Sequence, residues 1–445
     1  MLLYFITQID IEILFYLLKS KIQTKKPIMI DYPNILDIIF DKLLNNSIKP
    51  IIIGGYVRDF LLKKESKDID IELYGISSFS KLEKILEEFG DVNSVGKSFG
   101  VCKLRVNNLD LDFSFPRSDS KIDRGHKGFE IKVDSSLDFK TATSRRDFTI
   151  NAIGYDIQTK EILDPFNGQE DLKNRILKAV NIEKFKEDPL RVLRAVQFSS
   201  RFNLSIDNEL FITCQNMIKD SLLNELPKER IFIEIQKLLL KSSSPSSGIK
   251  LLNSLGGFSY FTEFKNINTA GLEKIYQAVD TMSSLKIANS KTNTMLMLSV
   301  LCYLLPADKC ETFLSKLSND KSLFNNILSL LKHQNDINFE IFSDYDIYIL
   351  ATKVTIEEFI LFSLAISQTK IEAENINSLK IRAKELGVLH EKAEAIIQGK
   401  DIISFGIKPS KEFSIILDRA YKAQISGNFK TKEEAYSWLK RELDT

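Results

Sequence analysis

The pattern of apolar and polar residues divides the chain into a front part that alternates strands with helices and a long remainder of helices. Short β-branched or alternating runs, typical of strands, are KPIII (49–53), DIDIEL (68–73), NNLDLDFSF (107–115) and FEIKV (129–133). Helical spacing follows in YVRDFLLKK (56–64) and in SSFSKLEKILEEFG, which ends at Gly90. These runs predict a small domain of mixed strands and helices.

From about Leu172 onwards, helical periodicity dominates, and strand signals are few. A serine-rich loop is expected at 242–248, and two helices joined by ISGNFKT (425–431) are expected near the end. The predicted fold class is α+β, with the mixed domain at the front of a long helical body. The expected parts are a helical appendage (1–30), a head (31–171), a helical neck (172–255), a helical body (256–395) and a helical tail (396–445).

Composition changes this picture little. The 445 residues are 44% hydrophobic and 27% charged, which is ordinary for a soluble globular protein. Lys+Arg number 61 against 60 Asp+Glu, so any nucleic-acid binding has to come from local patches. Four scattered cysteines fit reduced thiols in the cytoplasm.

The apolar N-terminus is predicted to form an amphipathic helix packed on the body. It lacks a basic region and a cleavage site, and it carries Asp10 and Glu12, so a signal or membrane segment is not expected. Translation from Met29, which would leave this stretch as an appendage, stays open.

Alternating carboxylates mark the second strand. In a strand Asp68, Asp70 and Glu72 project from one face, while Ile69 and Ile71 face the core. Adjacent carboxylates repel and call for a cation, most simply Mg²⁺. The ordinary alternative is a solvated strand face.

A glycine pair follows the first strand at Gly54 and Gly55, where backbone N–H groups and a helix start can hold phosphate. Arg58, one turn into the helix, can add a charged contact. The alternatives are a plain tight turn and an arginine paired with Asp59. No G-x-x-x-x-G-K-[ST] motif occurs, so this is not a P-loop.

Asp110 and Asp112, on another predicted strand, offer a third carboxylate. Two-metal nucleotidyl transfer commonly uses three carboxylates around an in-line displacement. Another solvated strand face is the alternative. Together these features predict a site for a nucleoside triphosphate with Mg²⁺.

Five ordered motifs carry a resemblance. GGYVRD…KDIDIELYG, SRRDFTINAIGYD (144–156), DPFNGQEDLKNRILKAV (164–180), EDPLRVLRAVQFSSRF (187–202) and PKERIFIEIQKLL resemble those of class II tRNA nucleotidyltransferases and bacterial poly(A) polymerases. The resemblance implies a polymerase-β-like nucleotidyltransferase head. It fades beyond about residue 250, and the segment GKDIISFGIKPSKEFSIIL is similar to the RNA-binding tail of that family.

The resemblance also implies residue roles. The glycine turn and Arg58 would contact the nucleotide's phosphates, and Arg145 and Arg146 would contact the nucleotide. Asp68 and Asp70 would ligate Mg²⁺, with Asp112 as the third catalytic carboxylate. Since these positions match the family's motifs, they form the predicted catalytic centre.

The neck motif EDPLR would select the base. Asp188 and Arg191, three apart on one helix face, can present acceptor and donor groups to the edge of cytosine or adenine. Arg194 would reach the triphosphate. At Gln197 the family usually has arginine, so this chain lacks a cation there. A helix ion pair is the ordinary reading of the Asp188–Arg191 spacing.

Two further basic segments are candidates. Pro116–Ile131, a predicted loop with Arg117, Lys121, Arg124 and Lys127, resembles the loop that helps the family switch nucleotides. In the tail, Lys408, Lys411, Lys422 and Lys430 could contact RNA. Solvated surface residues are the alternative in both cases.

The expected function is Mg²⁺-dependent addition of C and A to tRNA 3′ ends, with CTP and ATP as substrates and tRNA as partner. The enzyme is expected in the cytoplasm, as a monomer or homodimer, without membrane contact. Addition of A only, of CC only or of poly(A) are alternatives, as is an RNA-binding scaffold with an inactive head. None of the three histidines is followed by Asp, so a phosphohydrolase activity is not expected.

Overall fold

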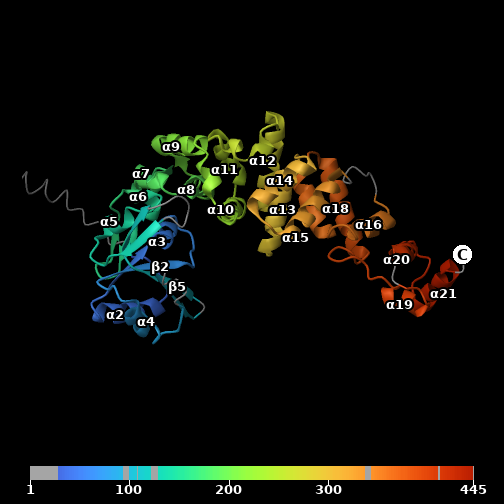
Figure 1. The fold of residues 1–445 in the computed structure, drawn as a ribbon, viewed down its shortest axis with the longest axis horizontal. Coiled ribbons are helices and arrows are strands. Elements are labelled where there is room, and N and C mark those ends of the chain that lie inside the picture. Colours follow the sequence, from blue (N-terminus) through green and yellow to red (C-terminus); the bar gives the residue numbers. More distant parts are fainter. Residues whose placement is uncertain are drawn as a thin grey trace, which may run out of the picture. The chain divides into compact units, whose positions relative to one another are not determined.

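The computed structural model describes residues 29–93, 100–107, 109–121, 129–335, 342–408 and 411–443 (Figure 1). The appendage predicted for 1–30 therefore lies almost entirely outside the described residues. The chain forms two compact units. The first comprises the described residues up to Ala195 together with Asn203–Leu226, and the second comprises Val196–Phe202 and the residues from Pro227 onwards. Helix α8 (Leu190–Phe202) contributes to both. The five predicted parts stay a prediction.

A seven-stranded mixed sheet organises the first unit. The strand order is β3-β4-β5-β2-β1-β8-β9, and of these neighbours only β2 and β5 are parallel. The bounds are β1 Lys49–Ile53, β2 Ile69–Tyr74, β3 Asp91–Asn93, β4 Val101–Val106, β5 Leu109–Ser114, β8 Gly154–Asp156 and β9 Glu161–Leu163. Strands β1, β2 and β5 confirm the strands predicted at 49–53, 68–73 and 107–115.

The central strands have one buried and one open face. Side chains on the buried face are Ile69, Ile71, Cys102, Leu104, Leu111 and Phe113. Helices α2 (Ile35–Asn45) and α4 (Phe79–Leu86) lie together in Figure 1 and bury apolar residues of their own. On strands β2, β4 and β5 the alternate positions carry charges, so the open face is polar.

Shorter elements surround the sheet. The helices are α3 Gly55–Leu61, α5 Phe139–Thr143, η2 Thr149–Asn151, α6 Gly168–Lys173, α7 Ile182–Lys186, α9 Asn208–Lys219 and η3 Leu222–Glu225. Strands β10 (Ile176–Leu177) and β11 (Ser205–Ile206) form a parallel pair. The helices predicted at α3 and α4 are confirmed, and Ser78 caps α4 by accepting from the Lys81 N–H.

The expectation of a loop at Pro116–Ile131 is wrong from Arg117 to Lys121, which forms a strand, whereas the strand predicted at 129–133 is confirmed. Strand β6 (Arg117–Lys121) pairs antiparallel with β7 (Phe129–Val133), because the backbone groups of both segments bond each other in a hairpin. The middle of the segment, with Arg124 and Lys127, lies outside the described residues.

The second unit is helical throughout its described residues, as predicted. Its helices are α10 Lys228–Lys241, α11 Pro245–Ser254, α12 Thr269–Ser284, α13 Ser290–Cys302, α14 Ala307–Leu317, α15 Lys321–Lys332, α16 Asp344–Ala351, α17 Ile356–Ile366, α18 Lys370–Glu385, α19 Gly399–Ser404, α20 Lys411–Ile425 and α21 Lys432–Leu443, with short 3₁₀ turns η4 Gly257–Ser259 and η5 Thr262–Phe264. The loop expected at 242–248 is shorter than predicted, because Pro245 opens α11 at its first helical position.

The last three helices share a small core of their own. Phe429 and Leu439 are buried in it, and the Phe429 ring lies 5.6 Å from that of Trp438. The pair of helices predicted around ISGNFKT is thereby confirmed. Of the predicted tail lysines, Lys408 and Lys430 are exposed, whereas Lys422 pairs with Asp418 at 2.8 Å.

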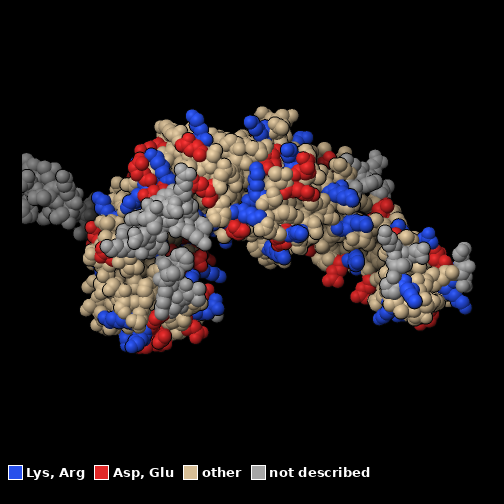
Figure 2. Space-filling view, viewed as in Figure 1, with Lys and Arg blue, Asp and Glu red and all other residues tan. Residues whose placement is uncertain are grey.

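Acidic and basic side chains are interspersed over the face seen in Figure 2, with no single continuous basic surface. This agrees with the formal net charge of +1. In the part of the chain that the structure describes, no helix has the length and apolarity needed to cross a membrane.

Candidate active site

The carboxylates predicted from the strand pattern meet on the open face of the sheet. Asp70 of β2 is the direct neighbour of Asp112 of β5 in the parallel register, and Asp68 immediately precedes β2. Asp70 is also the neighbour of Ile53, the last residue of β1 before the glycine turn. A cleft of about 570 Å³ opens here, lined by Asp68, Asp70, Asp91, Asp110, Asp112, Lys103 and Arg105 among others.

Negative charge is concentrated in this cleft. Partial withdrawal from water raises the pKa of Asp70, and the carboxylates of Asp112 and Asp68 raise it further against the pull of Arg146. On β4, Lys103 Nζ donates to both carboxylate oxygens of Asp112, at 3.0 and 2.9 Å. The site therefore combines repelling carboxylates with one ammonium.

The donor set fits a hard divalent cation, since carboxylate oxygens are the ligands that Mg²⁺ prefers. Asp68 and Asp70 would hold it, beside Asp112. In the described residues, however, no three Asp, Glu, His or Cys side chains converge as a finished ligand set. Asp112 is engaged by Lys103, so a metal that uses Asp112 has to displace this ammonium or share the carboxylate with it.

Glu72, the last acidic residue of β2, is buried rather than open to the cleft. It is 1% exposed, accepts from the Tyr74 hydroxyl at 2.7 Å, and pairs with Arg145 at 3.3 Å. Glu72 thus fixes Arg145 beneath the open face of the sheet.

The predicted phosphate turn is built around Gly54, whose φ of 75° and ψ of −119° suit glycine alone among ordinary residues. A Cβ at this position would lie 2.6 Å from a guanidinium nitrogen of Arg146. Burial lowers the pKa of Arg146, with Arg145 acting in the same sense. Its Nε has no hydrogen-bond partner among the described residues, and one terminal N–H donates to the Asn151 carbonyl at 3.1 Å. Arg146 is therefore the guanidinium with spare donor capacity beside the turn.

The two glycines provide a matched pair of variants. We expect Gly54→Ala to destabilise the first unit by about 1–3 kcal/mol, because the backbone is strained for alanine and Arg146 has to move. At Gly55 a Cβ would meet only Arg58, at 3.7 Å, which is ordinary contact. Thermal unfolding of Gly54→Ala and Gly55→Ala measures the difference. Equal effects at the two positions would contradict the assigned role of Gly54.

A buried polar network joins α3 to the neck helix. Arg58, 4% exposed, bonds Asp59 through Nε and donates to the side-chain oxygen of Asn151. Asn151 donates to Asp147 at 3.0 Å, and Asp147 accepts from Arg194 Nε at 2.7 Å. The network therefore spans the glycine-turn helix, η2 and α8.

Asp147 is the centre of this network. Burial alone would raise its pKa, but Arg194 and the Asn151 hydrogen bond outweigh that effect, and the pKa lies below its ordinary value. Asp147 is therefore an anion held by its neighbours. Arg58 forms the pair with Asp59 that was the alternative to a phosphate contact, and this pair is buried.

Arg191 of α8 bonds two backbone carbonyls of the first unit. Its two terminal nitrogens donate to Lys184 O and Arg145 O, each at 2.7 Å. Burial lowers its pKa, against the opposite effect of Asp147 and Asp188. Arg191 thus lies beside the backbone of Arg145.

The expectation that Asp188 and Arg191 share a helix face is wrong. Asp188 precedes α8, and its carboxylate accepts from the Leu190 N–H at 3.1 Å. Pro189 explains the difference, because the residue before a proline is disfavoured in helical conformation. Asp188 therefore acts as a cap, from the turn that leads into α8.

Family models match two segments of the chain. The family model described as "Poly A polymerase head domain" matches residues 51–178, and the one described as "Probable RNA and SrmB- binding site of polymerase A" matches residues 203–267. These matches confirm the resemblance to class II tRNA nucleotidyltransferases and bacterial poly(A) polymerases over the two segments.

Similarity to relatives extends beyond the matched segments. A CCA-adding enzyme of Staphylococcus epidermidis is 26% identical over 90% of this chain and 96% of its own length. A multifunctional CCA protein of Pseudoalteromonas atlantica is 35% identical over 43% of this chain and 46% of its own. The first relative thus matches both the head and the helical remainder.

Solved structures share the fold. The Bacillus stearothermophilus CCA-adding enzyme, solved in complex with CTP, superposes with a TM-score of 0.71 and 21% identity, covering 93% of this chain and 98% of that one. The Thermotoga maritima enzyme, solved with tRNA, gives 0.64 and 20%, covering 93% and 97%. The predicted α+β fold, with its nucleotidyltransferase head and helical remainder, is confirmed.

Gln197, where the family usually has arginine, is 1% exposed on α8. Its Nε2 has no hydrogen-bond partner among the described residues. The side chain is therefore buried, one helical turn beyond the partly exposed Arg194.

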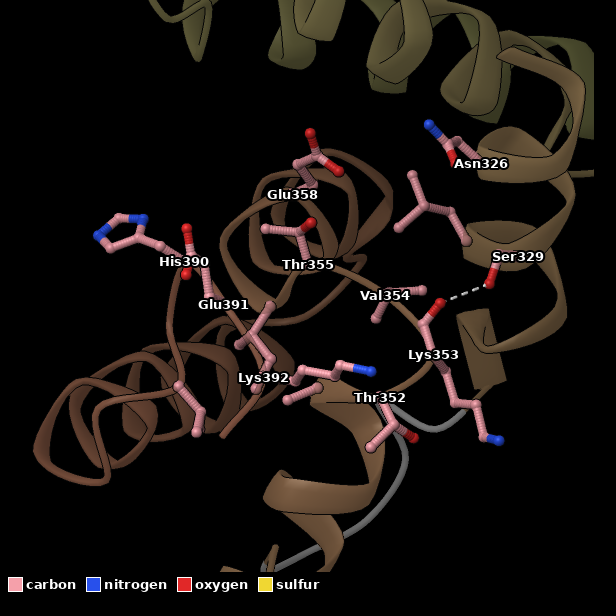
Figure 3. Close-up of a pocket in the computed structure, with 14 residues that line it drawn as sticks. Asn326, Ser329, Thr352, Lys353, Val354, Thr355, Glu358, His390, Glu391 and Lys392 are labelled. Atoms are coloured by element: carbon pink, nitrogen blue, oxygen red, sulfur yellow. Dashed lines mark hydrogen bonds between the residues drawn. The ribbon is translucent and has the colours of Figure 1, made fainter. Parts of the chain in front are cut away.

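A second hollow lies in the helical body and differs from the family's active site (Figure 3). It measures about 340 Å³ and is lined by residues at the start of α17 and after α18, including Thr355, Glu358 and Lys392. Ser329 Oγ donates to the Lys353 carbonyl there, at 2.9 Å. Basic and acidic side chains are mixed, and no residue predicted from the motifs lies in it.

Three contributors to the site were missed from the sequence. Asp147 and Asn151 lie inside the motif SRRDFTINAIGYD, where Asp147 directly precedes an apolar run that Asn151 interrupts, and that interruption is a usable signal. Lys103 was missed because VCKLRV was not assigned as a strand. Its basic residues alternate opposite LDLD, a pattern typical of cross-strand ion pairs.

Proposed function

We propose that the protein is a template-independent RNA nucleotidyltransferase that adds C and then A residues to the 3′ end of tRNA. The 3′-hydroxyl oxygen attacks the α-phosphorus of CTP or ATP. A new ester bond forms, the bond to the β-phosphate oxygen breaks, and pyrophosphate leaves as the hydroxyl proton is lost.

One observation carries the proposal. Asp70 lies in register between Asp112 on β5 and Ile53, the residue that precedes the glycine turn. The sheet thus sets a carboxylate pair beside the glycine turn, in a chain matched by family models for both a polymerase head and an RNA-binding segment. This is the arrangement that nucleotidyl transfer requires.

In this proposal the glycine turn and Arg146 hold the triphosphate, with Arg145 fixed beside them by Glu72. Arg58, buried with Asp59 and Asn151, positions the start of α3. Asp68 and Asp70 hold Mg²⁺, with Asp112 as the third carboxylate. When bound, the cation would lower the pKa of the attacking hydroxyl and neutralise charge at the α-phosphate.

Selection of the base is proposed for Asp188 and Arg191, with Arg194 directed at the triphosphate. Asp188 lies in the turn before α8, where its carboxylate accepts from the Leu190 N–H, three residues from Arg191. A carboxylate and a guanidinium can bond the Watson–Crick edge of either cytosine or adenine.

The partners proposed are tRNA, CTP and ATP, with the neck, body and tail binding the RNA backbone. CCA-adding enzymes with a similar fold were solved in complex with ATP, with CTP and with tRNA, and these complexes support the proposal. We place the enzyme in the cytoplasm, as a monomer or homodimer.

Substrate choice tests the proposal. Full-length protein is incubated with Mg²⁺, CTP and ATP, and with either a tRNA transcript lacking CCA or an unstructured RNA of equal length. The proposal predicts three added nucleotides on the tRNA alone. Long adenosine tracts on both RNAs would favour a poly(A) polymerase. Extension of neither RNA would favour the inactive-head scaffold.

A further inference from the structure

Lys103 occupies a defined place beside the predicted metal ligands. In the β4–β5 register its direct neighbour is Asp112, and the ammonium donates to both oxygens of that carboxylate. The Lys103 side chain is 58% exposed and Asp112 is 34% exposed. An exposed cross-strand pair of this kind contributes little to stability. The pair therefore calls for a different explanation.

The position of Asp112 provides one. Asp112 is the neighbour of Asp70 in the β2–β5 register, so the ammonium lies on the carboxylate closest to the predicted metal ligand. The cleft is lined by five carboxylates and two basic side chains, and one of the latter, Arg105, binds Asp110 through Nε and NH2. Of the two basic side chains that line the cleft, Lys103 is thus the one that pairs with Asp112.

A divalent cation would use the same oxygens. Both Asp112 oxygens already accept from Lys103, so a metal that is to use Asp112 has to displace the ammonium or share a carboxylate with it. Lysine suits such displacement, because its compact charge sits on a flexible four-carbon stem.

We propose that Lys103 is a resident counter-ion of Asp112 that a divalent metal displaces, and that it sets the metal concentration at which the catalytic site loads. This inference rests on the proposed function for the identity of the site. Lys103 is a positioning residue, since it holds Asp112 oriented and neutralised until the metal binds.

Arg105 offers a matched comparison on the same two strands. It pairs across the ladder with Asp110, two residues from Lys103, and both side chains of that pair are about two-thirds exposed or more. Asp110 has no partner on β2, because the β2–β5 register begins at Leu111. Arg105→Met therefore removes the same charge from the same cleft without freeing Asp112.

Manganese binding to the full-length protein tests the inference without any catalytic step. Free Mn²⁺ is measured by electron paramagnetic resonance for wild type, Lys103→Met, Lys103→Arg, Arg105→Met and Asp70→Asn. We expect Lys103→Met to bind Mn²⁺ about tenfold more tightly, because one nearby repelling charge is removed. Lys103→Arg keeps the charge, and the Arg105 charge is paired with Asp110 and exposed to screening salt. Both variants should therefore stay within about twofold of wild type.

The outcomes separate this inference from the proposed function. If Lys103→Met binds Mn²⁺ as wild type does, or changes no more than Arg105→Met, the counter-ion role is overturned, even where Asp70→Asn loses binding. If the Lys103 effect appears but wild type extends no RNA, the counter-ion role stands and the proposed function fails. Thermal unfolding of each variant is the control that tests whether the fold is retained.

Discussion

Asp70→Asn is expected to reduce nucleotide addition by about 10³-fold or more, with the fold retained. The exposed carboxylate adds no hydrogen bond that the sheet needs, whereas the cation it holds supplies several kcal/mol of transition-state stabilisation. The measurement is single-turnover extension of tRNA by CTP and ATP at saturating Mg²⁺. Chelation of Mg²⁺ should stop addition by the wild type in the same way.

Asp110→Asn is the control for Asp70→Asn. Asp110 lies on the same face of β5 and lines the same cleft, but it pairs with Arg105 and has no neighbour on β2. Its replacement should change the rate by about twofold at most, since an exposed ion pair contributes little. Similar losses in both variants would argue for a general charge effect and against a specific metal ligand.

Asp147→Ala is expected to destabilise the first unit by about 3 kcal/mol. The change leaves the Phe148 N–H, Asn151 and Arg194 without their shared acceptor, and removing one partner of a buried ion pair is far more costly than losing an exposed one. Hydrogen exchange in peptides covering 139–156 should therefore accelerate about 10²-fold. Glu183→Ala, which removes an exposed pair with Lys186 on α7, is the control and should change exchange little.

The pH dependence of Asp147→Ala has a definite sign. Because the pKa of Asp147 is lower in the folded than in the unfolded protein, its stabilisation is fully present above about pH 4 and is lost as the pH falls toward the folded value. The difference in unfolding free energy between wild type and Asp147→Ala should narrow below about pH 4. A difference that stays constant down to pH 3 would show that Asp147 does not act through its charge.

The sheet positions of the carboxylates could be predicted because strand alternation is a local property. Ile69 and Ile71 alternate with Asp70, and that pattern alone assigns the acid to the open face. The parallel pairing of β2 with β5, which brings Asp112 beside Asp70, could not be read locally. It depends on which strands become neighbours, and here the motif resemblance supplied the link.

Residues that act through tertiary contacts were harder to predict from the sequence. Asn151 bridges Arg58 and Asp147, which lie 93 and 4 residues away along the chain. No periodicity links such positions. The prediction that Asp188 lies on the helix was wrong for a local reason. Pro189 disfavours helical conformation at Asp188, and this effect is visible in the sequence.

Ordered growth of tRNA tests the central claim most directly. Purified protein with Mg²⁺ receives transcripts ending before CCA, after C and after CC, each with CTP alone, ATP alone or both, and the products are resolved to single nucleotides. The account predicts growth of every transcript to CCA followed by a stop. Addition of A only to the CC-ended transcript would mean an A-adding specialist, and no extension of any transcript would contradict the account.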